Sequence, residues 1–394
     1  MRRIYLDHAA TTKTRKEAVE AMLPYFTEHY ANPSAVYSFA GEAKKGLDES
    51  RKTIADILGA KPEEIYFTGG GTESDNWALL AAADAYEQKG KHIITTKIEH
   101  HAILHTCAYL EKKGFEVTYL DVDEFGLVNP EDVEKAVRPD TILISVMFAN
   151  NEIGTVEPVK EIGAIAKSHG VLFHTDAVQA FAHIPINVDE MNIDMLSASG
   201  HKFYGPNGVG FLYIRKGVKI RSYMHGGAQE RKRRAGTSNT PGIVGMGTAA
   251  KLAASEMERE SERQCRLRDY LIGRVLKEIP YSRLNGDPKR RLPNNVSFCF
   301  RFIEGESMLI NLDLAGICAS SGSACTSGSL DPSHVLLAVG LPHEIAHGSL
   351  RLTIGDETTQ EDLDYVADQL VKIVGNLRNM SPLYEDFMKK NGKK

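Results

Sequence analysis

The stretch SASGHKFYGPNGVGFLY (197–213) decides the fold. It joins two apolar runs of strand length through a turn rich in glycine, and Lys202 lies in that turn between Gly200 and Gly205. A lysine in such a turn is usually exposed to solvent. The alternative is a buried lysine that forms a Schiff base with a carbonyl compound. The stretch by itself favours the exposed lysine, so the surrounding sequence has to decide between the two.

Seven apolar or β-branched runs of strand length follow one another between residues 64 and 214. They are EIYFT (64–68), HIITT (92–96), FEVTYL (115–120), TILISVM (141–147), VLFHTDA (171–177), DMLSASG (194–200) and GVGFLYI (208–214). Helical patterns separate several of them, for example at 73–88 and 158–170. Runs that do not alternate and are joined by helices are typical of a mostly parallel sheet covered on both faces. We therefore predict an α/β fold with a mostly parallel, seven-stranded sheet.

The remainder of the chain has a different pattern. Residues 245–280 read as one long, charged amphipathic helix, which is a natural bridge between domains. The run NNVSFCF (294–300) predicts a strand, and further helical patterns follow without long alternation. Because 394 residues exceed one ordinary domain, we predict a second, smaller α+β domain after the long helix.

The composition excludes several classes of protein. Hydrophobic residues make up 42% and charged residues 25%, as in water-soluble globular proteins, and the net charge of −5 favours neither nucleic acid nor an anionic membrane as a partner. We interpret the short basic runs at 230–236 and 289–291 as solvated or anion-contacting surface. The five cysteines include no CxxC pair, which argues against a disulfide framework and a zinc site. With no leader-like or membrane-spanning apolar run, we expect a cytoplasmic protein with reduced thiols.

Two further clusters precede the lysine turn in the chain. In TGGGTESDN (68–76) a strand runs into three glycines and then a helix, and Thr72 adds a hydroxyl. A helix N-terminus of this kind offers backbone N–H groups to a phosphate, although a tight turn is an equal alternative. Asp176 ends the apolar run 171–177, where it is either an N-cap or a buried carboxylate that needs a cation.

Taken together, the three clusters change the interpretation of each one. A pyridoxal-phosphate site needs a lysine for the Schiff base, a carboxylate that keeps the pyridine nitrogen protonated, and a phosphate cradle. Lys202, Asp176 and the segment 68–76 supply all three within one α/β domain. His100, which follows the run 92–96, is placed to stack on the ring.

A fourth cluster surrounds Cys325. Serines and glycines fill the segment 320–329, which predicts a mobile loop with an exposed thiol suited to a nucleophile or carrier. A linker that happens to hold a cysteine is the alternative. Asp331 and Pro332 are predicted as N-cap and first residue of the next helix. The other cysteines are expected to be buried and inert; they are Cys107, Cys265, Cys299 and Cys318.

At this point the chain resembles the NifS/IscS-type cysteine desulfurases of the fold-type I pyridoxal-phosphate enzymes. The likeness covers essentially the whole chain. The motifs that carry it are YLDHAATT (5–12), GGGTESDN (69–76), EHHAI (99–103), ANNEIGT (149–155), HTDAVQ (174–179), SGHKFYGPNGVG (199–210), HGGAQERKRRAGT (225–237), RLPN (291–294), SSGSACTSGSLDPSHV (320–335) and SLRLTIG (349–355). The loop motif at 320–335 is that of the long-loop subgroup.

The resemblance implies a role for each matching residue. Lys202, His100 and Cys325 are the implied catalytic residues, and Cys325 takes the sulfur of L-cysteine as a persulfide while L-alanine leaves. Arg351 binds the substrate carboxylate, with Asn32 nearby. The implied cofactor-binding residues are Gly71, Thr72, His100, Asn151, Asp176, Gln179, Ser199, His201, Lys202 and Thr237. Thr237 would come from the partner subunit, so a homodimer is implied.

The resemblance also implies an organisation and partners. The large pyridoxal-phosphate domain would span 14–257, and the small domain 1–13 and 258–394. The expected partner is a sulfur-acceptor protein such as an iron–sulfur scaffold. We expect no resident metal; Cys325 would contact an iron–sulfur cluster only transiently. The alternatives are a selenocysteine lyase, an aminotransferase or lyase of the same fold, or a sulfur-carrier scaffold without catalysis.

Two positions depart from the pattern of the family. Tyr37 stands where histidine is frequent, which affects a contact on the substrate side. Asp356 stands where many relatives have arginine, and we interpret this as a surface change. Neither residue belongs to the clusters described above.

Overall fold

The computed structural model of the chain describes residues 3–321 and 332–391. Cys325 and Asp331 lie outside the described residues, as does most of the predicted loop 320–329. Within the described part, no helix is long and apolar enough to cross a membrane.

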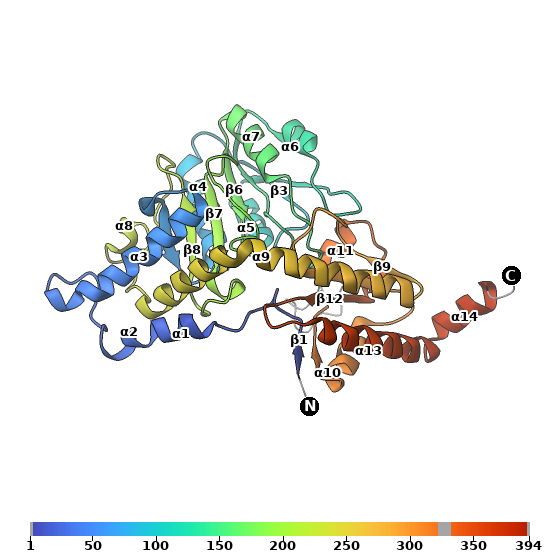
Figure 1. The fold of residues 1–394 in the computed structure, drawn as a ribbon. Helices are drawn as coiled ribbons and strands as arrows, with labels where there is room; N and C mark the ends of the chain where they lie inside the picture. The colour runs from blue at the N-terminus through green and yellow to red at the C-terminus, as the bar shows by residue number, and fades with distance from the viewer. Residues whose placement is uncertain (1–2, 322–331, 392–394) are drawn as a thin grey trace.

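The central feature is a seven-stranded sheet built from the seven predicted runs (Figure 1). The order across the sheet is β2-β8-β7-β6-β5-β3-β4, and pairing is parallel from β7 to β4 and antiparallel where β8 meets β7 and β2. The prediction of a mostly parallel α/β sheet is confirmed. The strands are β2 (Ile65–Thr68), β3 (His92–Thr96), β4 (Glu116–Leu120), β5 (Thr141–Ser145), β6 (Leu172–Asp176), β7 (Met195–Ser199) and β8 (Gly210–Ile214).

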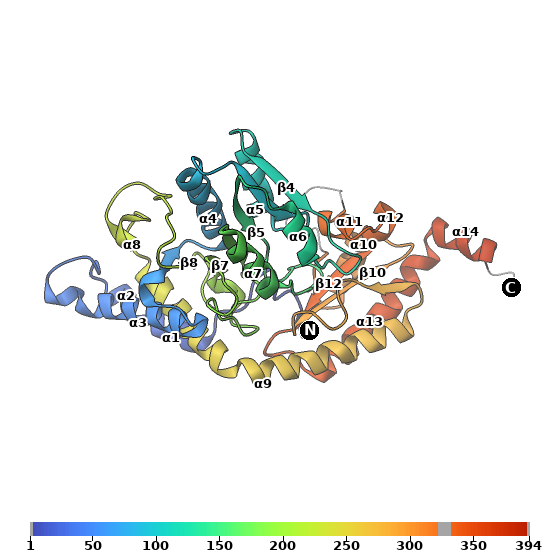
Figure 2. The same ribbon diagram turned by 90° about the horizontal axis from the view of Figure 1, so that it is seen from above.

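Both faces of this sheet are buried, which explains why its strands read as continuous apolar runs. Consecutive residues of one strand enter different cores: Ile93 packs with α4 (Gly71–Tyr86) and α5 (His101–Glu111), whereas Ile94 packs with α3 (Gly41–Leu58), α7 (Val159–His169) and the first half of α9 (Thr240–Glu278). Figure 2 shows these two groups of helices on either side of the strands. A sheet covered in this way needs apolar residues at every position rather than at alternate ones.

The long helix α9 bridges two hydrophobic cores, as predicted (Figure 1). Ile243 and Met246 in its first half pack in the core beneath the large sheet, whereas Leu267 and Leu271 pack in a second core. That second core lies around a small antiparallel sheet of order β12-β10-β9. Its elements are β9 (Ser282–Leu284), β10 (Asn295–Phe300), β12 (Ser349–Thr353), α10 (Gly305–Leu314) and α13 (Gln360–Asn379).

The remaining elements are short, and the longest of them is α14 at the C-terminal end. They are β1 (Ile4–Tyr5), α1 (Lys16–Met22), α2 (Pro24–Thr27), η1 (Ser38–Ala40), η2 (Pro62–Glu64), α6 (Pro130–Ala136), η3 (Gly200–Lys202), α8 (Gln229–Lys232), β11 (Ile317–Cys318), α11 (His334–Ala338), α12 (His343–Ala346) and α14 (Pro382–Asn391).

The start of α11 differs from the prediction. Ser333 is the N-cap, and its hydroxyl accepts hydrogen bonds from the backbone N–H groups of Val335 at 3.1 Å and Leu336 at 3.2 Å. The predicted cap at Asp331 and Pro332 was therefore wrong. The serine hydroxyl performs the same task, because any short side-chain oxygen at this position can accept those bonds.

Candidate active site

A cavity of about 230 Å³ opens beside the carboxyl ends of β6 and β7. This is the edge at which open α/β sheets bind ligands. Ten of the predicted site residues line it; they are Gly71, Thr72, His100, Asn151, Asp176, Gln179, Ser199, His201, Lys202 and Arg351. The structure therefore brings together residues that lie up to 280 positions apart in the sequence.

Lys202 enters the cavity from η3, directly after β7. Its ammonium group donates hydrogen bonds to the backbone oxygens of Ala9 at 2.7 Å and Ala10 at 2.8 Å. The backbone oxygen of Lys202 bonds to the ring of His183 at 2.9 Å. Both the backbone and the side chain of Lys202 are therefore held by hydrogen bonds. The solvent-exposed lysine predicted from the stretch 197–213 alone is not what the structure shows.

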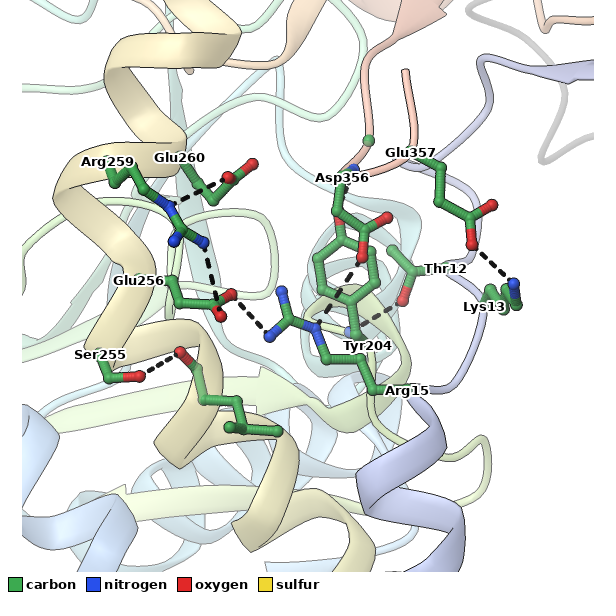
Figure 3. Close-up of polar contacts among 12 residues, drawn as sticks. Thr12, Lys13, Arg15, Tyr204, Ser255, Glu256, Arg259, Glu260, Asp356 and Glu357 are labelled. Carbon is green, nitrogen blue, oxygen red and sulfur yellow. Dashed lines mark hydrogen bonds and ion pairs between the residues drawn. The ribbon is translucent and has the colours of Figure 1, made fainter. Parts of the chain in front are cut away.

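The N-terminal segment holds the lysine turn in place (Figure 3). The Thr12 hydroxyl donates to the backbone oxygen of His201 at 3.0 Å and accepts from the backbone N–H of Tyr204 at 2.8 Å. Tyr204 needs such support because its φ of +65° is in the left-handed region, which is costly for a residue with a bulky side chain. The backbone N–H of Arg15 donates to the oxygen of Tyr204 at 3.0 Å and completes the contact.

A charged cluster closes the same junction from the opposite side (Figure 3). The Arg15 guanidinium lies over the Tyr204 ring at 5.0 Å, forms an ion pair with Glu256 of α9 at 2.7 Å, and lies 3.9 Å from the Asp356 carboxylate. The backbone N–H of Asp356 also donates to the Tyr204 hydroxyl at 3.1 Å. Asp356 is exposed, in line with its interpretation as a surface change, and it also links the turn after β12 to the lysine turn.

Asp176 ends β6 at the floor of the cavity and is 5% exposed. One of its oxygens accepts the backbone N–H of Val178 at 2.9 Å. Burial raises the pKa of Asp176, and the nearby His100 and Lys202 act in the opposite direction. No helix begins at Asp176, so the N-cap alternative does not apply. A buried carboxylate in this position is stabilised by a cation in the cavity.

His100 is the N-cap of α5, and its Nδ1 accepts the backbone N–H of Ala102 at 3.1 Å. That bond places the ring at the cavity wall and requires Nδ1 to be unprotonated, so the proton of the neutral ring is on Nε2. Burial lowers the pKa of His100, with Lys202 acting in the same direction and Asp176 opposing both. His100 is therefore neutral at pH 7, as suits a ring that stacks on another aromatic ring.

The phosphate cradle predicted at 68–76 is the first turn of α4. A Cβ atom on Gly71 would lie 2.6 Å from the Val178 side chain, so glycine is required where the helix approaches the loop after β6. Ser199, at the end of β7, and His201, in η3, line the same cavity as Gly71 and Thr72 of this turn. Hydroxyl, imidazole and backbone N–H groups around a helix N-terminus form a suitable site for a phosphate.

Arg351 reaches the cavity from β12 of the small sheet and is 4% exposed. Its guanidinium donates to Asp7 at 2.9 Å and to the backbone oxygen of Asn151 at 3.1 Å, while its Nε is buried without a hydrogen-bond partner. An arginine with remaining donors can bind a carboxylate in a bidentate manner.

Two predicted residues lie outside the cavity, and one cannot be described. Asn32 and Thr237 are both exposed and do not line it. Cys325 lies in 322–331, but both flanks of that segment are fixed at the site. Ser320 exchanges backbone hydrogen bonds with Arg351, and His334 bonds to the backbone oxygen of Glu99, next to His100.

The cavity also contains residues that the sequence analysis missed, namely Ala9, Ala10, Asp75, Met147, Ala149 and Val178. Most of them contribute backbone or apolar surface, which leaves no signal in a motif. Asp75 is different, because it is an acidic residue one helical turn after Gly71. That spacing puts both residues on the same helix face, and this signal was available in the sequence.

The expectation for two of the remaining cysteines was also wrong. Cys107 and Cys299 are buried, and burial raises the pKa of the Cys299 thiol to about 11. Cys265 and Cys318 are only half-buried. Cys318 lies in β11, three residues before Ser321, where the described part of the chain ends.

Comparisons with known proteins agree with this arrangement. The family model described as aminotransferase class-V matches residues 4–366. The chain belongs to this family. It is 60% identical over 380 residues to a protein named cysteine desulfurase IscS from Methanosarcina thermophila, covering 96% of this chain and 94% of that protein.

Solved structures of similar proteins share the fold. A structure described as a NifS-like protein superposes with a TM-score of 0.90 at 38% identity, covering 95% of this chain and all of that one. A structure of SspA in complex with cysteine superposes with a TM-score of 0.79 at 40% identity, covering 89% of this chain and 98% of that one. The fold is that of the fold-type I pyridoxal-phosphate enzymes.

Class-V aminotransferases depend on pyridoxal phosphate, and the residues of this cavity fit that cofactor. Lys202 supplies the amine, Asp176 supplies a buried carboxylate in need of a cationic partner, and the turn at Gly71 offers N–H groups to the phosphate. The three groups lie around one cavity, at the edge where open α/β sheets bind ligands.

We expect Thr12→Val to destabilise this class-V aminotransferase by about 1–3 kcal/mol. The change keeps the shape of the side chain but leaves the N–H of Tyr204 and the oxygen of His201 without the hydroxyl. Urea unfolding measures the change. Lys13→Met is the control, because its ion pair with Glu357 is exposed and such pairs contribute about 0–1 kcal/mol. Equal stability of Thr12→Val and the parent would contradict a role of the N-terminal segment in holding the turn.

Proposed function

We propose how the residues of this pyridoxal-phosphate-dependent cysteine desulfurase divide the work. The enzyme converts L-cysteine to L-alanine and retains the sulfur on Cys325 as a persulfide. The observation that carries the proposal is the convergence of Lys202, Asp176, His100 and Arg351 on one cavity. An aminotransferase or lyase of the same fold would share these groups, but Cys325 between two flanks fixed at the cavity favours sulfur transfer.

Lys202 performs two tasks in this proposal. It holds the cofactor covalently, and it then moves a proton to and from the substrate Cα. The hydrogen bonds from its ammonium to Ala9 and Ala10 support this, since they fix the Nζ atom at the cavity wall rather than in solvent. When bound, pyridoxal phosphate supplies an electron sink, and Asp176 maintains that property by holding the ring nitrogen as a cation.

Arg351 orients the substrate. Its guanidinium binds the carboxylate of L-cysteine, and the contacts to Asp7 and Asn151 keep the arginine plane fixed before the substrate arrives. When the Arg351 guanidinium binds the substrate carboxylate through two hydrogen bonds, the thiol of the substrate is directed away from the arginine.

We propose that Asn151 and Gln179 bind the hydroxyl side of the cofactor ring and that Gly71, Thr72, Ser199 and His201 bind its phosphate.

Cys325 attacks the sulfur of the substrate as a thiolate, which is the reactive form of cysteine. The carbon–sulfur bond breaks, the sulfur stays on Cys325, and alanine leaves after a proton reaches the former thiol-bearing carbon. The fixed flanks support this proposal. Ser320 is joined to Arg351 itself, and His334 is joined to the residue before His100, so the segment between them begins and ends beside the substrate site.

We expect Lys202→Ala to lose the visible absorption band of the lysine-bound cofactor and to lower desulfurase activity by at least about 10²–10⁴-fold. One amine provides both the covalent attachment and the proton transfer. Absorbance and alanine release measure the two losses. Lys97→Ala, at an exposed lysine that pairs with Asp121, should match the parent. A normal absorption band in Lys202→Ala would assign the attachment to another residue.

We expect Cys325→Ala to retain the cofactor and to bind cysteine with a change in the visible spectrum, yet to release no alanine and form no persulfide. Binding and electron withdrawal need no thiol, whereas removal of the sulfur needs an acceptor. Cys318→Ala is the matched control, since Cys318 is half-buried near the same segment, and it should remain active. Alanine release by Cys325→Ala at the parent rate would refute the role of Cys325.

We propose that the enzyme is a homodimer in which Thr237 completes the phosphate site of the partner subunit. Thr237 is exposed, and the segment around it is held by ion pairs between Arg234 and Glu73 and between Arg51 and Glu230. The chain also exposes a run of large apolar side chains over α1, α2 and η1, which is costly for a monomer. These side chains are Val19, Leu23, Phe26, Tyr30, Val36, Tyr37 and Phe39.

Sedimentation should give twice the 43.4 kDa of one chain. We expect the double variant Phe26→Asp, Phe39→Asp to sediment as a monomer and to bind the cofactor more weakly, because it would lose the partner's Thr237. The control is Leu383→Asp, on an exposed apolar residue of α14. A parent that sediments as a monomer, or a dimeric double variant, would contradict this interface.

The wider organisation forms part of the same proposal. We propose a large domain at 14–257 and a small domain formed by 1–13 and 258–394. Its support is that Ile4 and Leu6 pack in the second core with Leu267 and Leu271. We place the reaction in the cytoplasm, where the thiol of Cys325 stays reduced, and propose a sulfur-acceptor protein such as an iron–sulfur scaffold as the partner.

A further inference from the structure

Asp75 is a buried carboxyl group that the reaction described above does not use. It lies on α4 one turn after Gly71, lines the cavity and is 1% exposed. Its carboxyl group lies within hydrogen-bonding reach of that of Asp176, and its Oδ1 is buried without a hydrogen-bond partner. Two carboxyl groups in contact and away from water are not both ionised at low cost, so the pair shares one proton.

The surroundings of Asp75 provide no compensating cation. Within the described ranges, the basic side chain within 4 Å of its carboxyl group is His174, whose Nε2 lies 3.8 Å from Oδ1. His174 is itself enclosed, with the Ser145 hydroxyl on Nδ1 at 2.9 Å and the Ser197 hydroxyl on Nε2 at 3.0 Å. Burial lowers the pKa of His174 to about 3, so the ring is neutral.

The charges around the pair place the proton on Asp75 rather than on Asp176. The Lys202 ammonium favours the ionised form of Asp176, and so do the backbone N–H of Val178 and the hydrogen bond from Asp75. On the other side, burial raises the pKa of Asp75 well above its usual range, and the charges of Asp176 and Glu99 raise it further. A hydrogen bond with the Ser197 side chain acts in the opposite direction, but burial and the neighbouring carboxylates outweigh it, so the neutral form of Asp75 is favoured.

We propose that Asp75 is a positioning residue for the ring nitrogen of the cofactor: it stays protonated and donates its O–H to Asp176, which remains a carboxylate facing that nitrogen. The inference rests on the cofactor position proposed above. No bond to the cofactor is made or broken by Asp75, and the proton count of the site is one on Asp75 and one on the ring nitrogen.

The donated hydrogen bond has a defined chemical effect. It makes Asp176 a weaker base, so the proton between the carboxylate and the ring remains on the nitrogen. An ionised Asp75 would have the opposite effect, because a second negative charge would raise the basicity of Asp176 and draw the proton away from the ring. The electron sink would then be weaker in the enzyme at the same pH.

The test uses two substitutions of Asp75 in the holoenzyme and one control on the same helix. Asp75→Asn keeps a neutral group with an N–H donor toward Asp176. Asp75→Leu removes the donor and keeps a side chain of similar volume. If the leucine variant does not fold, Asp75→Ala is used in its place. Asp84→Asn is the control, because Asp84 is exposed on α4 and pairs with Arg221.

Two measurements report on the protons directly, apart from activity. The ¹⁵N NMR shift of cofactor labelled at the ring nitrogen should be that of a protonated ring in the parent, in Asp75→Asn and in Asp84→Asn. It should move toward that of a neutral ring in Asp75→Leu. In protein labelled with ¹³C at the aspartate carboxyl carbon, the infrared carboxylic-acid band should persist at pH 7, well above the ordinary aspartate pKa of about 3.9. Asp75→Asn should lose that band.

Activity should follow the ring proton. We expect kcat to fall about tenfold or more in Asp75→Leu while Asp75→Asn stays within about twofold of the parent, as expected when the donor and not the charge matters. A neutral-ring signal in Asp75→Asn, or an acid band unchanged in that variant, would show that Asp75 is ionised and would overturn the proposal. A protonated-ring signal in Asp75→Leu would also overturn it. A shift in Asp84→Asn would instead question the cofactor position.

Discussion

The parallel pairing of β6 with β7 is the contact on which the site depends. It sets Asp176 beside Ser197 and ends both strands at one edge of the sheet, so the carboxylate and the turn that carries Lys202 face the same space. A slip of this register by one residue would turn Asp176 to the other face of the sheet. The buried apolar residues on both faces of these strands oppose such a slip, and the core that stabilises the fold thus also fixes the chemistry.

The N-terminal segment turns this sheet edge into a closed site. It pairs with the small sheet through Asp7 and Arg351, and with the lysine turn through Thr12 and Tyr204. The distance between Arg351 and Lys202 is therefore set by the few residues of this segment, which contact both the small sheet and the lysine turn. Arg15 adds a connection to α9, the helix that spans both cores.

The sequence predicted the sheet well and the polar interior poorly, for a physical reason. Buried strands need an apolar residue at every position, and that demand is visible without knowledge of partners. Arg291, by contrast, lies in a short basic run and was interpreted as surface, yet its guanidinium donates to the buried oxygens of Ile153 and Asn285. Asp75 was also missed, although its spacing of four residues from Gly71 places it on the cavity face of α4. Whether a charged residue is buried depends on groups supplied by distant segments, and no local pattern records them.

The floor of the cavity shows how such buried charges can be tolerated. Asp75, Asp176 and Glu99 lie beneath the site, and ionising all three would place several negative charges where water cannot screen them. Hydrogen bonds from Thr96 and the backbone of Met147 stabilise Glu99, and the Lys202 ammonium stabilises the Asp176 carboxylate. Asp75 has a hydrogen bond with the Ser197 side chain but no cation beside it among the described residues, and burial together with the neighbouring carboxylates outweighs that bond. A protonated acid at position 75 therefore gives Asp176 a hydrogen-bond donor that keeps its proton at neutral pH. A serine hydroxyl can rotate away from Asp176 and a water molecule can exchange, so neither would hold this hydrogen bond as firmly.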